Sequence, residues 1–171
     1  MRFVLLLSVL LLLGLACHSP SPQQPAEPPV KAIVDAYYAV YQARSDFQHF
    51  LSFYDEQLVF EDLILGERHL GKKDFAEFFD WNNSNFSKID SVALKIEEQI
   101  VEKNRVVTKG HFTPFRWGDF TFEAMHFTTI LTFNEAGKIQ RQVDWINYPN
   151  NLVDYNKRNN ANRWIVEPPA Q

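Results

Sequence analysis

Two aspartates in segments that resemble strands could act as acid and base. Asp62 lies in the partly β-branched and aromatic segment 58–63, and Asp144 stands between Val143 and Trp145. Burial in apolar surroundings raises the pKa of a carboxyl group, and two carboxylates close together push their pKa values apart. Acid/base chemistry near neutral pH requires such shifted values. If both side chains approach one apolar pocket, they are the first candidates for catalysis.

Each aspartate also has a structural interpretation. Asp62 could cap the turn before Gly66. Asp144, flanked by apolar residues, needs a partner, and a salt bridge to Arg141 or Arg105 would supply one.

Two histidines, His111 and His126, could orient a carboxylate or act as a base. Which face of its strand each occupies is open, and both could instead be exposed or internally satisfied. The more apolar alternating set around His111 is Val106, Thr108, Gly110 and Phe112.

The sequence has no motif for metal binding, phosphate binding or a serine nucleophile. Glu61, Asp62, His69 and His111 do not match the spacing of a known metal site. The six glycines are not clustered and Gly-x-Ser-x-Gly is absent, so neither a phosphate loop nor a nucleophile elbow is indicated. The net charge of −4, without a basic run, argues against nucleic acid as a partner. We expect no cofactor and no metal.

The N-terminal half of the domain reads as helical. Val30 to Tyr41 has apolar residues at three- and four-residue spacing, which predicts an amphipathic helix ending near Ser45. Asp46 can cap a second, shorter helix, which would extend to Tyr54. A third helix is predicted over residues 72–81, before the breaker sequence of residues 82–85.

Strands are predicted for segment 58–63 and for most of the chain from Ile89 onward. Alternating runs cover residues 92–96 and 106–112, and a fourteen-residue strand region covers 120–133. A tight turn at 134–137 precedes the last strand, 139–147. Helices first and an antiparallel meander afterwards predict an α+β fold, with the helices packed in the concave face of a strongly curved, mainly antiparallel sheet. The 15 Phe, 6 Tyr and 4 Trp residues favour an aromatic-lined cavity at the open end of this cone.

Three pieces of the chain resemble the SnoaL-like branch of the nuclear-transport-factor-two-like superfamily over residues 30–155. They are Ser45–Asp46 between the opening helices, Phe60-Glu61-Asp62 followed by Gly71 and a Phe-rich helix, and Phe133-Asn134-Glu135-Ala136-Gly137-Lys138-Ile139 before Asp144-Trp145. The resemblance implies the cone-shaped α+β barrel of ketosteroid isomerases. It indicates a fold rather than a function, because this fold serves isomerases, cyclases and binding modules.

The resemblance also implies roles for particular residues. Compared with ketosteroid isomerases, Asp62 falls on the proton-shuttling aspartate and Tyr38 on the oxyanion donor, while Thr129 replaces the second aspartate. SnoaL-type cyclases place their acid/base aspartate in the last strand, where this chain has Asp144. For Tyr38, the alternative is a packed ring whose hydroxyl meets a backbone partner.

The same comparison predicts which side chains line the cavity. Gln140, Gln142, Asp144 and Ile146 share one face by two-residue alternation, and by the resemblance that face looks inward. His111 belongs to a segment that resembles the Gly-Thr-His of SnoaL-like strands. The expected ligand-pocket residues are Phe60, Phe79, His111, Phe127, Thr129, Gln142 and Ile146.

The first 29 residues are interpreted as an export and anchoring segment. Residues 3–16 form a 14-residue apolar stretch, and Leu13-Gly14-Leu15-Ala16-Cys17 resembles a bacterial lipoprotein signal. We expect residues 1–16 to be removed and Cys17, the only cysteine, to be lipidated; an ordinary cleaved signal is the alternative. Residues 17–29 form a proline-rich tether, 30–160 the domain and 161–171 a tail. The expected location is the bacterial cell envelope, periplasmic or on the outer surface.

Three functions remain open. The first is an exported, membrane-anchored domain that binds a small, largely apolar molecule. The second is an acid/base isomerase or cyclase acting on a carbonyl compound, in which Asp62 or Asp144 moves the proton and Tyr38 stabilises the enolate. The third, compatible with either, is an interaction module that forms a homodimer through the sheet.

Overall fold

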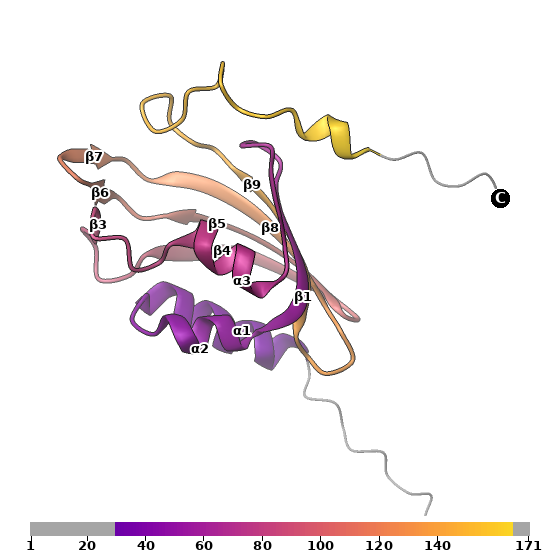
Figure 1. Cartoon of the computed structure of the whole chain (residues 1–171). Helices are drawn as coiled ribbons and strands as arrows, with labels where there is room; N and C mark the ends of the chain where they lie inside the picture. The colour runs from indigo at the N-terminus through magenta and orange to yellow at the C-terminus, as the bar shows by residue number, and fades with distance from the viewer. Residues whose placement is uncertain (1–29, 166–171) are drawn as a thin grey trace, which may run out of the picture.

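The computed structural model describes residues 30–165 (Figure 1). The predicted signal peptide 1–16, lipidated Cys17, the tether 17–29 and the end of the predicted tail lie outside the described residues. None of the helices within the described part is long and apolar enough to cross a membrane.

Three helices precede most of the sheet. They are α1 (Val30–Ala43), α2 (Phe47–Ser52) and α3 (Lys72–Phe79). The buried stripe of α1 carries three tyrosines, as its spacing predicts. Asp46 caps α2 by accepting a hydrogen bond of 2.8 Å from the His49 amide. The third helix ends two residues early because Asp80 adopts a left-handed conformation with φ 36°.

A six-stranded sheet curves around these helices. Its strands are β1 (Tyr54–Asp62), β2 (Glu67–Leu70), β4 (Leu94–Glu102), β5 (Arg105–Phe112), β8 (Met125–Phe133) and β9 (Ile139–Ile146), in the order β2-β1-β9-β8-β5-β4. Among these six strands, only β1 and β9 pair in parallel. The helices lie on the concave side of the sheet (Figure 1). The predicted α+β architecture is confirmed.

Tyr54 differs from the prediction, because it begins β1 rather than extending the second helix. The chain turns at Phe53, whose carbonyl accepts a hydrogen bond of 2.8 Å from the Ile139 amide. This contact pairs Tyr54 with Ile139 on β9. Its ring therefore enters the core, where a long-range strand pairing outweighs the local helical spacing.

Gln140 was expected on the inward face of β9, and it is exposed instead. The pairing of β8 with β9 shifts by one residue at this point, so that Ile139 is fully buried. A β-bulge moves every residue on one side of it to the other face. Beyond the bulge, the inward alternation of Gln142, Asp144 and Ile146 holds.

The predicted fourteen-residue strand is divided into two. Its first part, β7 (Phe120–Phe122), joins β6 (Phe115–Trp117) and β3 (Phe86–Lys88) in a separate three-stranded sheet. Pro114 follows the end of β5 and has no N–H to continue the ladder, so the chain leaves the main sheet there. β8 begins at Met125, the partner of Phe112. The small sheet forms one wall of the open end of the cone.

Aromatic rings fill the closed part of the cone. Tyr37 and Phe50 stack with ring centroids 5.2 Å apart, and Tyr54 contacts Phe75 at 4.7 Å. The high aromatic content therefore serves the core as well as the cavity.

The chain beyond β9 folds back over the turn between β1 and β2. The Arg158 side chain donates to the Ile64 carbonyl at 2.8 Å, and a short 3-10 helix covers Ala161–Trp164. The approach is closest at Gly66, where a Cβ atom would stand 2.2 Å from the Asn159 carbonyl oxygen. Only glycine fits there.

Candidate functional site

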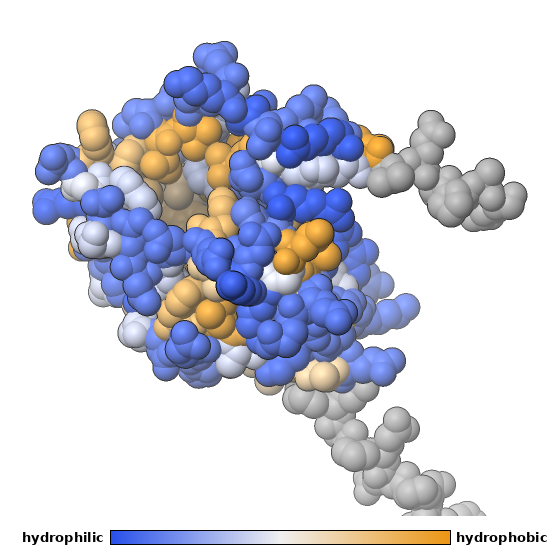
Figure 2. All heavy atoms as spheres, in the orientation of Figure 1, coloured by the Kyte–Doolittle hydropathy of each residue, from blue (hydrophilic) through white to orange (hydrophobic). Residues whose placement is uncertain are grey.

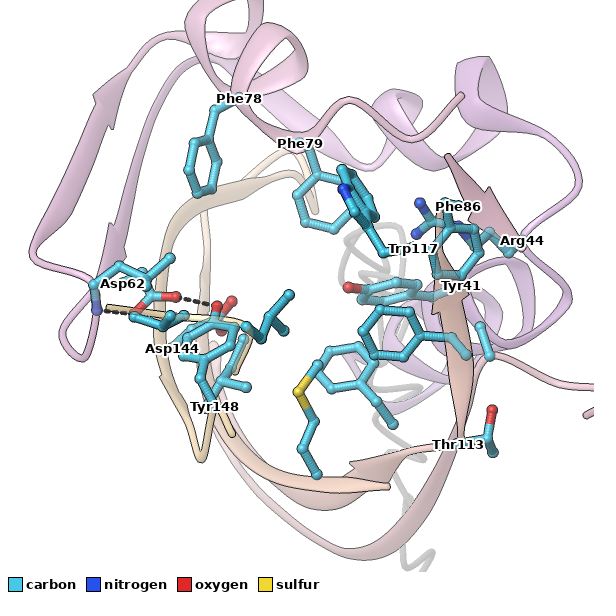
Figure 3. A pocket seen from close by; sticks show the side chains of 18 of the residues that line it. Tyr41, Arg44, Asp62, Phe78, Phe79, Phe86, Thr113, Trp117, Asp144 and Tyr148 are labelled. Carbon is cyan, nitrogen blue, oxygen red and sulfur yellow. Dashed lines mark hydrogen bonds between the residues drawn. The ribbon is translucent and has the colours of Figure 1, made fainter. Parts of the chain in front are cut away.

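The open end of the cone holds a cavity of about 530 Å³. Figure 2 shows apolar side chains gathered around the hollow, and Figure 3 shows it from close by. This volume lies in the range of sites for small organic molecules. Most of the lining is aromatic or aliphatic, from α1, α3, both sheets and the segment after β9: Tyr41, Phe60, Leu65, Phe78, Phe79, Phe86, Ala93, Phe112, Phe115, Trp117, Met125, Ile146, Tyr148, Leu152 and Val153.

Asp144 is the more perturbed of two carboxyl groups in this apolar wall. It is 5% exposed, and its two oxygens accept hydrogen bonds from the Thr129 hydroxyl (2.6 Å) and the Gln142 side-chain amide (2.9 Å). Burial raises the pKa of Asp144 to about 7, against the lowering effect of these two donors. A carboxyl group with this pKa can give up and take back a proton near neutral pH.

A chain of buried side chains orients the amide that supports Asp144. The Gln142 amide nitrogen donates to Asp144, while its oxygen accepts from the Tyr54 hydroxyl at 2.7 Å. Since the single proton of Tyr54 is used there, the Tyr37 hydroxyl must donate to the Tyr54 oxygen, 2.9 Å away. The interior of the cone therefore fixes which end of the Gln142 amide faces Asp144.

Asp62 also lines the cavity, but it is held differently. One of its oxygens accepts the backbone amides of Ile64 and Leu65, both at 2.9 Å, and the other accepts the Tyr148 hydroxyl at 2.6 Å (Figure 3). Burial raises the pKa of Asp62, and these three donors oppose the rise. The capping interpretation of Asp62 therefore describes its contacts.

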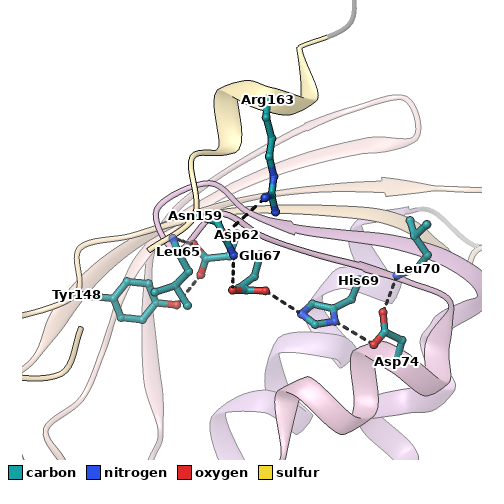
Figure 4. Close-up of polar contacts among 9 residues, drawn as sticks. All are labelled: Asp62, Leu65, Glu67, His69, Leu70, Asp74, Tyr148, Asn159 and Arg163. Atoms are coloured by element: carbon teal, nitrogen blue, oxygen red, sulfur yellow. Dashed lines mark hydrogen bonds and ion pairs between the residues drawn. The ribbon is translucent and has the colours of Figure 1, made fainter. Parts of the chain in front are cut away.

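Polar contacts continue outward from this turn (Figure 4). Glu67 accepts from the Asn159 side-chain amide at 3.2 Å, and His69 lies 3.1 Å from Asp74. These contacts join the segment after β9 to β2 and α3, so that the Asp62 region is part of a larger structural network.

The two aspartates stand side by side. Asp62 pairs with Asp144 in the parallel register of β1 and β9, and its negative charge contributes to the raised pKa of Asp144. The expected salt bridges of Asp144 do not form. Arg141 points to the other face and binds Glu61 at 2.6 Å, while no carboxylate among the described residues pairs with Arg105.

Tyr38 lies behind the cavity wall rather than in it. Its ring is buried, and its hydroxyl lies beside those of Thr108 and Thr129 without a hydrogen bond of normal geometry to any described residue. Tyr41, one helical turn further along α1, lines the cavity, and its hydroxyl points toward the hollow (Figure 3).

The expected ligand-pocket residues separate into three groups. Phe60, Phe79 and Ile146 line the cavity. Phe127, Thr129 and Gln142 are buried behind the wall, where the latter two support Asp144. The third group is a correction. His111 points away from the cavity and contacts Glu97 at 2.8 Å, and His126 on the neighbouring strand is exposed.

Several cavity residues were not predicted. Tyr148 continues the inward alternation of positions 142, 144 and 146, so the period of two could have found it. Arg44 and Trp117 had no such signal. Arg44 reaches the cavity through its own left-handed backbone conformation just after α1, and Trp117 through the separate small sheet. Among residues 30–165, no group of three or more His, Cys, Asp or Glu side chains could hold a metal ion.

Solved structures similar to this fold come from several bacterial proteins. One from Shewanella denitrificans, provisionally designated a SnoaL-like polyketide cyclase, matches with a TM-score of 0.60 and 19% identity, over 71% of this chain and 92% of that one. One from Pseudomonas putida, provisionally designated a polyketide cyclase, has a TM-score of 0.55 and 20% identity, over 72% and 94%.

A third similar structure is that of TerC, co-crystallized with polyporic acid. It has a TM-score of 0.55 and 22% identity, over 70% of this chain and 92% of that one. No curated protein matches the chain. At these identities the structures establish the fold alone. The model of the SnoaL-like domain family matches residues 34–142, and the chain therefore belongs to that family.

Proposed function

We propose that the protein binds a small, largely apolar carbonyl compound in this cavity and moves a proton on it with Asp144. The observation that carries the proposal is a buried carboxyl group with a pKa of about 7 in the wall of an aromatic cavity. Each oxygen of Asp144 accepts one hydrogen bond and keeps a lone pair for a substrate proton.

The chemistry that fits is proton abstraction next to a carbonyl group. As a carboxylate, Asp144 takes the proton from carbon, and as an acid it returns the proton at another position of the enolate. The hydroxyl of Tyr41 faces the same cavity and supplies a donor for the enolate oxygen. Tyr38, the donor implied by the family resemblance, lies behind the wall and fills this role less well.

Two of the similar structures support a compound of this kind. One is provisionally designated a polyketide cyclase, and TerC was co-crystallized with polyporic acid. A cavity wall built mostly of aromatic rings suits flat, unsaturated molecules, because rings pack face to face or edge to face.

Hydrogen exchange into small ketones tests the proposal without knowledge of the natural substrate. Residues 30–165 in D₂O are mixed with a panel of aromatic ketones, whose α-protons exchange slowly by themselves near neutral pH, and NMR follows the loss of the α-proton signal. We expect exchange of at least one compound, rising through an apparent pKa near 7 as Asp144 ionises. Asp144→Asn should slow it by about 100-fold or more.

The matched control is Asp62→Asn, which keeps an acceptor oxygen for the two backbone amides. We expect it to retain most of the exchange activity. Equal loss in both variants, or unchanged exchange in Asp144→Asn, would remove Asp144 from the mechanism. If polyporic acid binds and no ketone exchanges, the cavity serves binding alone.

Membrane anchoring through Cys17 remains part of the proposal and rests on the sequence of residues 13–17. The full chain is expressed in a bacterium supplied with an alkyne-labelled fatty acid. We expect label on the wild-type protein in the membrane fraction, and neither label nor membrane retention for Cys17→Ser. An unlabelled wild-type chain would contradict the anchor.

A homodimer formed through the outer face of the sheet also remains a proposal. Trp145 on β9 is 38% exposed and Ile100 on β4 is 58% exposed, which leaves apolar surface on the sheet. Sedimentation velocity should show a dimer that Trp145→Glu dissociates. A wild-type monomer at high micromolar concentration would exclude it.

A further inference from the structure

The end of the cavity farthest from the aspartates carries positive charge. Arg44 and Lys88 both line it, and Figure 3 shows Arg44 across the hollow from Asp62 and Asp144. The cavity therefore has a carboxyl end and a cationic end with apolar walls between them. The two charges act in opposite directions on the pKa of the Tyr41 hydroxyl, which Arg44 lowers and Asp144 raises.

The guanidinium of Arg44 is held in place by aromatic rings. It lies 3.9 Å from the centre of the Phe86 ring and 4.8 Å from that of Trp81, and one amino group donates to the Trp81 carbonyl at 3.0 Å. Its backbone has φ 47°, in the left-handed region where glycine is the usual residue after a helix. The side-chain position is therefore fixed by packing despite an unfavourable backbone conformation.

Among residues 30–165, the Arg44 guanidinium uses little of its hydrogen-bonding capacity. A guanidinium has five N–H donors, and one is engaged with Trp81. The buried Nε of Arg44 has no partner among the described residues. Within residues 30–165 no carboxylate lies within 4.0 Å of either Arg44 or Lys88, and Asp80 acts on Arg44 from beyond that distance.

A half-buried cation without a counter-ion is costly, whereas an anion at the same position would form charge-assisted hydrogen bonds. Lys88 adds a second charge at the rim, where its ammonium group donates to the Ala43 and Ser91 carbonyls at 2.6 and 3.3 Å. Both residues thus line the same cavity, and among residues 30–165 neither has a carboxylate within ion-pair distance.

We propose that Arg44 and Lys88 bind an anionic group of the ligand, so that the molecule in the cavity is an aromatic or apolar acid rather than a neutral compound. The inference rests on the proposed function in one respect: the anionic end at Arg44 places the other end of the molecule near Asp144. A planar carboxylate or sulfonate suits the forked guanidinium.

A matched pair of fluorescent probes tests this inference separately from catalysis. The probes are 8-anilinonaphthalene-1-sulfonate and N-phenyl-1-naphthylamine, which share one aromatic skeleton and differ by the sulfonate. Fluorescence titration gives both dissociation constants for each variant. We expect Arg44→Gln to weaken the sulfonate about 10- to 30-fold and to change the neutral probe less than twofold.

Four further variants make the result specific. Lys73→Gln removes the same charge from an exposed site on α3 and should change neither probe. Arg44→Lys should restore part of the sulfonate affinity, and Lys88→Gln should weaken it two- to threefold. Val153→Trp narrows the cavity and should weaken both probes, which establishes where they bind.

Two outcomes would overturn the inference: equal weakening of both probes by Arg44→Gln, or unchanged sulfonate affinity in Arg44→Gln combined with Lys88→Gln. Asp144→Asn separates this inference from the proposed function, because it should slow ketone exchange about 100-fold or more and keep the effect of Arg44→Gln on the sulfonate.

Discussion

The surroundings of Asp62 and of Asp144 differ although the two residues are strand neighbours. Both side chains are buried, both line one cavity, and they pair in register on β1 and β9. Asp62 accepts two backbone amides of the turn that follows it, together with a tyrosine hydroxyl. Asp144 accepts only side-chain donors, Thr129 and Gln142.

This difference separates a structural carboxylate from a reactive one. Backbone amides in a tight turn cannot turn away, so an aspartate that satisfies them stabilises the fold only while it remains an acceptor. A hydroxyl can rotate and accept a hydrogen bond from the protonated carboxyl group instead. The same residue type, on adjacent strands, thus has a structural role in one place and a proton-transfer role in the other.

The largest expected effect is on stability and comes from Asp62, the structural carboxylate. Asp62→Ala leaves two backbone amides and the Tyr148 hydroxyl without their acceptor, and we expect it to lower the free energy of unfolding by roughly 3 kcal/mol. Urea denaturation of residues 30–165 at pH 7 measures it. Asp62→Asn, which keeps one acceptor oxygen, should cost less than about 1 kcal/mol, and equal losses would show that the turn does not depend on this contact.

The second expected effect is a gain in the free energy of unfolding, which depends on pH and comes from Asp144→Asn. The pKa of Asp144 is about 7 in the folded protein and about 4 in the unfolded chain, so the folded state binds the proton more tightly and loses stability as pH rises between these values. Asp144→Asn removes this loss. Relative to wild type, we expect the variant to gain about 2–3 kcal/mol between pH 5 and pH 8.

Thermal and urea unfolding at both pH values measure this gain. Exposed carboxylates with lowered pKa values, such as Glu97, contribute to both proteins alike and cancel in the difference. A difference that does not change with pH would mean that Asp144 titrates normally in the folded state.

A pair of conservative variants distinguishes the pKa of Asp144 from that of Asp62. Thr129→Val removes a donor to Asp144 and should raise its pKa by about one unit, whereas Tyr148→Phe removes a donor to Asp62 and should raise that pKa instead. Carbon-detected NMR titration of the side-chain carboxyl signals reads both values. If each variant moved both values equally, the two aspartates would titrate as one unit.

The smallest expected effect lies further back in the hydrogen-bonded chain. Tyr54→Phe removes the donor to the Gln142 oxygen and leaves the amide contact to Asp144 in place. We expect the pKa of Asp144 to move by only a few tenths of a unit, with a loss of about 1 kcal/mol in unfolding free energy. The same NMR and urea measurements apply. A shift of a full unit would show that the amide reverses when Tyr54 no longer holds it.

The sequence predicted the architecture well because its signals are periodic. The tyrosine stripe of the first helix, the Asp46 cap and the alternating last strands each gave the correct element. Errors arose where long-range pairing decided the structure. Tyr54 entered a strand through its contact with β9, and the small sheet required three segments to meet.

The candidate site was predicted in part, where its residues follow a periodic pattern in the sequence. Alternation along β9 gave Gln142, Asp144 and Ile146, and it extends to Tyr148. It failed at Gln140, since a bulge changes the face without any local signal. The position of Arg44 depends on a backbone conformation that favours glycine, so no propensity could have placed an arginine there.

Two of the residues that line the cavity lie in the segment after β9, outside any helix or strand. They are Leu152 and Val153, and hydrogen bonds from Arg158 to the Ile64 carbonyl and from Asn159 to Glu67 hold this segment against the β1–β2 turn. Part of the cavity wall is thus encoded separately from the acid/base residues. Exchange of that segment between related proteins would reshape this wall while Asp144, its donors and the cone behind them stay the same.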